Sequence, residues 1–178
     1  MRLNCTIDGT AFSLNVSSDK PLSLILQENI DSFAINNVCK GSQCGNCVVM
    51  LNSSCVLACL VPAFKINGAT ILTYEGFSKT LFCHDIEKAY SECGVKPCSQ
   101  CYASKTFLIA SIVEKIERNK QYNSLTKELK IKAAKTSKID SAFITKEIGI
   151  NSCKCMETSQ IIKIIRLVCQ YRRSRNAK

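Results

Sequence analysis

The stretch Cys39-Lys40-Gly41-Ser42-Gln43-Cys44-Gly45-Asn46-Cys47 places three cysteines at the spacing C-x4-C-x2-C. This is the plant-type spacing that holds a [2Fe–2S] cluster. Three thiolates converge on one small cluster only where the backbone folds tightly around it, and Gly41 and Gly45 permit such a fold. A further cysteine, Cys59, follows twelve residues after the run. Because the chain contains 13 cysteines in 178 residues, a chance grouping of ordinary thiols is the alternative.

The composition fits one globular domain or two small ones, with a hydrophobic share of 46%. No run of about 18 apolar residues occurs, so no membrane-spanning helix is expected. The segment Met1–Cys5 is followed by no apolar stretch typical of a secretory signal. An odd number of cysteines without such a signal favours reduced thiols and metal ligands over disulfides. A cytoplasmic protein without a membrane partner is therefore expected.

The formal net charge of +10 comes from the second half of the chain. Residues 1–83 contain five basic and five acidic side chains, which leaves 19 basic and 9 acidic side chains for residues 84–178. A basic half can bind nucleic acid or an acidic protein surface, or can simply present solvated helix faces. Since no known DNA-binding motif is present, we expect no nucleic-acid partner.

The first part of the chain has the pattern of a small α+β sheet crossed by one helix. Asp8-Gly9 between two alternating runs is typical of a type I′ hairpin. Ser18 or Asp19 can cap a helix whose first turn accommodates Pro21. The expected elements are strands at residues 3–7, 11–16, 48–51, 55–60 and 69–73, the last of them at the edge of the sheet, and a helix at residues 21–29.

Beyond Gly76 the apolar residues recur with helical periodicity. The lysine-rich stretch 127–138 indicates an exposed helix or a mobile connection. Two domains are expected, at residues 1–77 and 84–178. The helices predicted in the second domain cover residues 84–93, 102–119, 124–135, 141–148 and 158–173.

A second set of cysteines lies in the helical part, as the pairs Cys98/Cys101 and Cys153/Cys155. Each pair precedes a predicted helix, and helix N-termini favour thiolates and lower their pKa. We therefore expect the two pairs to face each other in a four-cysteine site, with Cys93 as a weaker rival ligand. The spacing alone suits zinc as well as an iron–sulfur cluster. His84 is the only histidine, which excludes a Rieske centre with its two histidine ligands.

The five other cysteines are interpreted as small buried hydrophobic residues, although Cys55 remains a rival to Cys59 as a ligand. These five cysteines are Cys5, Cys55, Cys83, Cys93 and Cys169.

Glycine-rich phosphate loops are absent from the sequence, so flavin and nucleotide binding is expected on other chains.

The order of the motifs resembles the small iron–sulfur subunit of the molybdenum hydroxylases, the xanthine dehydrogenase family, over nearly the whole chain. Cys39–Cys47 is similar to the family's C-x4-C-G-x-C, and Thr73–Phe77 to its T-I-E-G-F. His84–Ala89 resembles its H-P-I-Q-K-A, which opens the helical domain. Cys98–Cys101 and Cys153–Cys155 match the cysteines of its Q-C-G-F-C and C-R-C.

The residues around the second set depart from the family pattern. Pro97 stands in place of glutamine, Ser99 in place of glycine, and Tyr102-Ala103-Ser104 in place of T-P-G. Met156-Glu157 replaces T-G after the last cysteine. All the cysteines of the family pattern are retained, whereas the neighbours that would face a pterin are not.

The resemblance implies an α+β fold: a β-grasp, ferredoxin-like [2Fe–2S] domain followed by an all-α, four-helix domain with a second [2Fe–2S] cluster. As ligands it implies Cys39, Cys44, Cys47 and Cys59 for the first cluster, and Cys98, Cys101, Cys153 and Cys155 for the second.

Related subunits pass electrons from a molybdopterin-binding subunit through both clusters to an FAD-binding subunit. The resemblance therefore implies an electron-transfer subunit of a heteromeric oxidoreductase of the xanthine or aldehyde dehydrogenase type. FAD and molybdopterin would lie on the partner subunits, and this chain would carry no catalytic residue. A zinc-stabilised protein-interaction module without redox activity is the alternative.

Overall fold

The computed structural model describes residues 1–30, 35, 44–128 and 141–176. Cys39, Gly41 and most of the lysine-rich stretch 127–138 lie outside these residues. In the part of the chain that is described, no helix is both long and apolar enough to cross a membrane.

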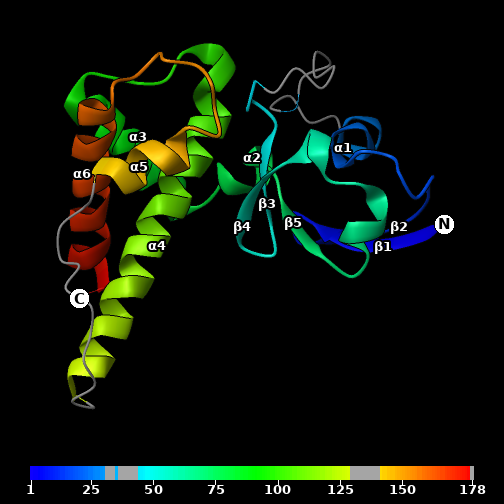
Figure 1. The fold of residues 1–178 in the computed structure, drawn as a ribbon, viewed down its shortest axis with the longest axis horizontal. Coiled ribbons are helices and arrows are strands. Elements are labelled where there is room, and N and C mark those ends of the chain that lie inside the picture. Colours follow the sequence, from blue (N-terminus) through cyan, green and yellow to red (C-terminus); the bar gives the residue numbers. More distant parts are fainter. Residues whose placement is uncertain (31–34, 36–43, 129–140, 177–178) are drawn as a thin grey trace.

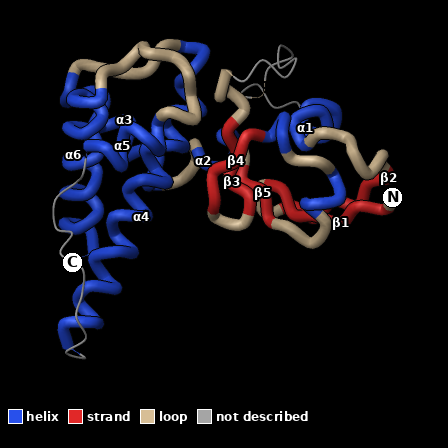
Figure 2. The backbone as a smooth tube through the Cα atoms, viewed as in Figure 1, coloured by secondary structure: helices blue, strands red, loops and turns tan. Residues whose placement is uncertain are grey.

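Five strands form one mixed sheet in the order β2-β1-β5-β3-β4, drawn in red in Figure 2. β1 pairs antiparallel with β2 and parallel with β5, and β3 pairs antiparallel with both β4 and β5. The strands are β1 (Arg2–Ile7), β2 (Thr10–Asn15), β3 (Val48–Leu51), β4 (Ser54–Leu57) and β5 (Thr70–Leu72).

The expectation that β5 lies at the edge of the sheet was wrong, because β5 is the central strand. Asp8 donates its backbone N–H to the Ile71 carbonyl on one side, and Asn52 donates to the Thr70 carbonyl on the other. A pattern of apolar residues reports which face of a strand is buried. It does not report how many neighbouring strands pair with it, and a three-residue strand carries little pattern at all.

The hairpin between β1 and β2 turns as the sequence predicts. Asp8 and Gly9 both have positive φ angles, 49° and 84°, as a type I′ turn requires. The Asp8 carboxylate also accepts hydrogen bonds from the Thr73 backbone N–H (2.7 Å) and hydroxyl (2.6 Å). Gly76 lies against this carboxylate, and a Cβ atom there would be 2.3 Å from Asp8 Oδ1. These contacts explain the threonine and the glycine of the stretch Thr73–Phe77.

The helix α1 (Leu22–Ile30) packs on one face of the sheet and directly follows Pro21, as predicted. The strand expected at residues 55–60 is shorter than predicted. It ends at Leu57 because the chain turns into a 3₁₀ helix, η1 (Ala58–Leu60), and a second such turn, η2 (Ala63–Ile66), follows.

The second half of the chain is helical, and its longer helices α3, α4, α5 and α6 pack against one another (Figure 1). α3 begins before His84 because Thr80 caps it, accepting a hydrogen bond from the Cys83 backbone N–H. α4 continues to Glu128, so the start of the helix predicted at 124–135 belongs to α4 and its remainder lies outside the described residues. The helices are α2 (Tyr74–Phe77), α3 (Leu81–Cys93), η3 (Ser99–Cys101), α4 (Tyr102–Glu128), α5 (Ser141–Ile148) and α6 (Thr158–Asn176).

Strand β3 connects two hydrophobic cores because its side chains alternate between the two faces of the sheet. Val48 and Met50 belong to the larger core, which contains residues of the helices. Cys47 and Val49 belong to the smaller core beneath α1. The sheet therefore lies between α1 and α4, as Figure 1 shows. The division into domains at residues 1–77 and 84–178 stays a prediction.

Candidate metal centres

The structure brings the second set of cysteines together. The Sγ atoms of Cys98, Cys101, Cys153 and Cys155 all lie within 4.8 Å of one another. The first pair lies at η3, directly before α4, and the second pair lies in the loop between α5 and α6. Two pairs that are about fifty residues apart in sequence thus form one four-thiol site, as expected.

Polar side chains fix the loop that carries Cys153. Asn151 is 4% exposed, and its Oδ1 accepts a hydrogen bond from the Cys153 backbone N–H (3.2 Å). Its Nδ2 donates to the hydroxyl of Ser104 (3.1 Å), which in turn donates to the Cys101 carbonyl (3.1 Å). Lys105 donates from Nζ to the Cys153 carbonyl (2.9 Å). The first turn of α4 therefore holds both pairs of cysteines in place.

The sequence analysis did not single out Asn151 or Lys105, and it named Ser104 only within the stretch that replaces the family's T-P-G. Only Lys105 carried a signal, because a lysine among apolar residues near the start of a helix contradicts the expected pattern. Nothing in the spacing of Asn151 or Ser104 distinguishes them from surface residues.

The thiols of the second set have different pKa values. A hydrogen bond with the Cys101 thiol lowers the pKa of Cys98, which is exposed. Burial raises the pKa of Cys101 to about 12 and also raises the pKa of Cys155. The lowered pKa of Cys98 comes from its hydrogen bonds, so the expectation that a helix N-terminus lowers the pKa of these thiols stays a prediction. The buried thiols need the positive charge of a bound metal to become thiolates, so metal uptake releases protons.

Four thiolates fit both a [2Fe–2S] cluster and a structural zinc ion. Two thiolates on one tetrahedral zinc ion lie about 3.8 Å apart, given the usual Zn–S distance of about 2.3 Å. The four sulfur atoms lie within 4.8 Å of one another, which is wider than that spacing but compact enough for one metal centre. The donor set therefore fits a metal centre, and the geometry alone leaves its identity open.

The first set of cysteines lies around the start of β3, and the structure describes three of its four members. Cys44 is in the loop before β3, Cys47 directly precedes β3, and Cys59 is in η1. The Ala58 backbone N–H donates to the Cys47 carbonyl (2.9 Å), which holds η1 beside the end of the loop. Cys39 lies outside the described residues.

The rival ligands lie elsewhere. The Cys55 thiol donates to the Phe107 carbonyl (3.6 Å), and burial raises the pKa of Cys55 to about 11. Cys55 packs against the larger core, whereas Cys47 and Cys59 are associated with the smaller one. Cys93, at the end of α3, packs against the larger core and is not a member of the four-thiol group.

The remaining cysteines and the histidine have ordinary surroundings. Cys5, Cys83 and Cys169 are buried in the two cores, as predicted. The side chain of His84 is 69% exposed and lies 3.7 Å from the Glu87 carboxylate, within the first turns of α3.

The two cysteine-bearing loops are in direct contact. The Cys44 carbonyl accepts hydrogen bonds from the Ser152 backbone N–H (3.2 Å) and hydroxyl (3.1 Å). Asn151 Nδ2 also lies within hydrogen-bond distance of the Gly45 carbonyl (3.2 Å) and of Asn46 Oδ1 (2.7 Å). Ser152 directly precedes the candidate ligand Cys153. Its backbone hydrogen bond to the Cys44 carbonyl therefore connects the loop of Cys153 directly to the candidate ligand Cys44.

Gly45 allows this close contact. Its φ angle is +74°, and a Cβ atom would lie 2.1 Å from the Ile150 carbonyl oxygen and 2.5 Å from Asn151 Cα. Any side chain at this position would push the two loops apart.

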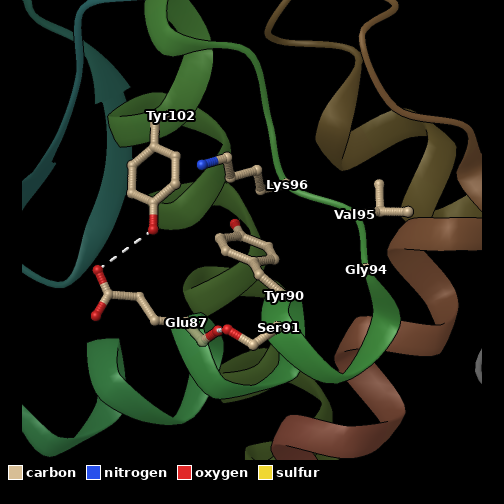
Figure 3. Close-up of a pocket in the computed structure, with 7 residues that line it drawn as sticks. All are labelled: Glu87, Tyr90, Ser91, Gly94, Val95, Lys96 and Tyr102. Carbon is tan, nitrogen blue, oxygen red and sulfur yellow. Dashed lines mark hydrogen bonds between the residues drawn. The ribbon is translucent and has the colours of Figure 1, made fainter.

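A pocket of about 380 Å³ is lined by residues of α3, of the loop that follows it and of the start of α4. Figure 3 shows the Tyr102 hydroxyl donating to Glu87 Oε1, at 3.3 Å. Aromatic rings and charged groups both face this pocket. Its lining consists of Glu87, Tyr90, Ser91, Gly94, Val95, Lys96 and Tyr102.

No protein-family model matches the chain. It is similar to the xanthine dehydrogenase iron–sulfur-binding subunit of Escherichia coli O157:H7, with 30% identity over 99 residues, which is 56% of this chain and 62% of that relative. The similarity thus spans less than two thirds of that relative's length. The chain is also similar to a subunit of nicotinate dehydrogenase from Pseudomonas putida, with 19% identity over 96% of both chains.

Among solved structures, the fold is similar to a chain of quinoline 2-oxidoreductase from Pseudomonas putida 86. The TM-score is 0.70 and the identity 21%, over 98% of this chain and 96% of that one. At this identity the similarity establishes the α+β architecture and the order of the elements.

Proposed function

We propose, since this chain belongs to the small iron–sulfur subunits of the xanthine dehydrogenase and aldehyde oxidoreductase family, that it carries electrons between two partner subunits. The electrons would come from a molybdopterin-binding subunit, pass through two [2Fe–2S] clusters and reach an FAD-binding subunit. The chain would perform no substrate chemistry itself.

The second cluster would be held by Cys98, Cys101, Cys153 and Cys155, whose sulfur atoms already converge. For the first cluster we propose Cys39, Cys44, Cys47 and Cys59. The plant-type spacing supports the first three. The hydrogen bond between Ala58 and Cys47 and the shared smaller core support Cys59, while Cys55 packs against the larger core.

The observation that carries the proposal is the contact between the two cysteine-bearing loops. When bound, each cluster would accept and release one electron. The protein supplies a short connection between the two sites, from the Cys44 carbonyl through the Ser152 backbone N–H to Cys153. Asn151 holds this connection in place from a buried position, because it binds both loops at once.

The names of the relatives support the proposed partners and substrate. Their names refer to xanthine, nicotinate and aldehydes, so we propose that the complex oxidises an N-heterocycle or an aldehyde, with xanthine or another purine as the first candidate. FAD and molybdopterin would lie on the partner subunits. The complex would be cytoplasmic, where thiols remain reduced.

A zinc-stabilised interaction module is the second candidate function. The observation in its favour is that all four sulfur atoms of the second set lie within 4.8 Å of one another, so they can close around a single metal ion. A zinc ion would stabilise the helical half without giving it redox activity.

Purification without oxygen, followed by analysis of iron, acid-labile sulfide and zinc, separates these functions. Two [2Fe–2S] clusters correspond to about four irons and four sulfides per chain and a brown protein. A colourless protein with zinc in place of iron would contradict electron transfer. Co-expression with candidate flavin and molybdopterin subunits should yield one complex that contains the brown chain, and failure to assemble with either would contradict the proposed partners.

A further inference from the structure

Lys105 is a buried cation beside the second cysteine set. It lies in the first turn of α4, four residues after Cys101, and only 1% of its surface is exposed. It is among the largest fully buried side chains of the described residues. Its Nζ donates to the Cys153 carbonyl at 2.9 Å.

This position is unfavourable for a lysine unless an anion lies nearby. A buried ammonium group loses its hydration, and one carbonyl does not neutralise its charge. The first turn of a helix is also the positive end of the helix dipole. The ion pairs between described residues all involve other cations, so no described carboxylate compensates Lys105.

The compensating anion is provided by the cysteines themselves. Its Nζ lies 2.9 Å from the carbonyl oxygen of Cys153, and the Sγ atom of Cys153 lies within 4.8 Å of the three other thiols. Four thiolates around an iron–sulfur core form a centre with net negative charge, and reduction adds one more negative charge to it.

We propose that Lys105 is the built-in counter-charge of the second cluster and raises its reduction potential. This inference rests on the proposed function. A fixed positive charge stabilises the reduced centre more than the oxidised one, and burial weakens the screening of that charge by water. Lys105 thus acts on the cluster through its positive charge and takes no part in bond making or breaking.

Lys154 offers a matched comparison. It lies between Cys153 and Cys155 in the sequence, so it is even nearer to the ligands along the chain, but its side chain is exposed. Water and salt screen an exposed charge, so it should affect the cluster much less.

The test is a potentiometric titration of the full-length, iron-loaded chain, with each centre followed by its own EPR signal. Lys105→Met and Lys105→Gln should reduce the equilibrium constant for reduction of the second centre by about tenfold or more, about 59 mV for one electron. Lys105→Arg should retain the wild-type value, and Lys154→Met should change it by less than about twofold. The first centre should be unchanged in all four variants.

Each result distinguishes the inference from the function on which it rests. A wild-type chain without iron contradicts the proposed function. Two normal centres with an unchanged potential in Lys105→Met overturn the counter-charge. If Met and Gln lose the second centre while Arg keeps it, the charge is needed for assembly, which supports the counter-charge. If Arg loses the centre as well, Lys105 is a packing residue and the inference is wrong.

Discussion

The two cysteine sets are built in different ways. Three members of the first set lie within the nine residues Cys39–Cys47, so one short stretch of sequence carries most of its thiols. The second set combines two pairs about fifty residues apart and depends on the packing of α4 beside the loop before α6. The first site should therefore depend mainly on local backbone conformation, and the second on tertiary structure. Four experiments test this difference.

Removing one ligand of the second set should have the largest effect. In Cys153→Ser we expect about half of the iron to be lost, because three thiolates no longer complete a [2Fe–2S] centre. The EPR signal of the first centre should remain, since its proposed ligands come from other segments. Iron analysis and EPR of the reduced protein measure both effects.

Cys93→Ser is the control for this experiment, because Cys93 is the rival ligand nearest in sequence to the second set. It should retain both centres. Loss of the second centre in Cys93→Ser but not in Cys153→Ser would reverse the assignment.

Gly45→Ala tests the contact between the two sites. The positive φ angle alone costs about 1–2 kcal/mol with a side chain present. The overlap with the Ile150 carbonyl should add about 1–3 kcal/mol, because backbone atoms cannot move aside easily. We expect a loss of about 4 kcal/mol in the free energy of unfolding, measured by urea denaturation.

Gly68→Ala is a matched control, because Gly68 has the same φ angle of +74° and no atom lies within 4 Å of the place that an added Cβ atom would take. It should cost only the backbone contribution of about 1–2 kcal/mol. Equal losses in the two variants would mean that the loops are not pressed together at Gly45.

Asn151→Ala should have a smaller effect than Gly45→Ala. It removes the side chain that joins the loop of Cys153 to Gly45 and Asn46, and leaves buried polar groups unpaired. We expect a loss of about 2–3 kcal/mol in the free energy of unfolding. The magnetic interaction between the two reduced centres should also weaken, which EPR relaxation measurements detect.

Ser152→Ala serves as the control for Asn151→Ala. Ser152 is exposed, and its backbone N–H keeps the hydrogen bond to the Cys44 carbonyl when the hydroxyl is removed. A loss below about 1 kcal/mol is expected. An Asn151→Ala protein with wild-type stability and wild-type coupling would show that Asn151 does not link the sites.

Cys55→Val should have the smallest effect on the free energy of unfolding, and this effect should depend on pH only above about pH 9. Burial raises the pKa of Cys55 in the folded protein from 9.0 to about 11. Above pH 9 the unfolded chain releases this proton while the folded chain retains it, so stability falls as pH rises from 9 to about 11. The slope should be about 1.4 kcal/mol per pH unit.

Cys55→Val lacks this titration, so the difference in stability between wild type and variant should change with that slope over this pH range. Urea denaturation at about pH 8, 9 and 10 measures it. A difference independent of pH would contradict the buried, protonated state of Cys55 and reopen its role as a ligand.

The sequence predicted the local features well. The Asp8-Gly9 turn, the helix after Pro21 and the helix at Ser141–Ile148 have local signals, namely turn residues, a helix-starting proline and a periodic apolar face. The central position of β5 could not be predicted, because pairing on both sides leaves no pattern in three residues.

The site was predictable to a similar extent. The spacing identified the four cysteines of the second set as ligand candidates, and the helices that follow them indicated that they converge. The buried polar residues between the two sites were not identified. Asn151 acquires its role only when the loop before α6 packs on the start of α4, so no local pattern marks it. Lys105 breaks the apolar pattern of its helix, but the sequence does not show which group it contacts.

EPR spectroscopy of the chemically reduced wild-type chain tests the electron-relay function most directly. We predict two distinct [2Fe–2S] signals of equal intensity, one for each set of four cysteines. A single signal, or an EPR-silent protein that contains zinc, would contradict the account.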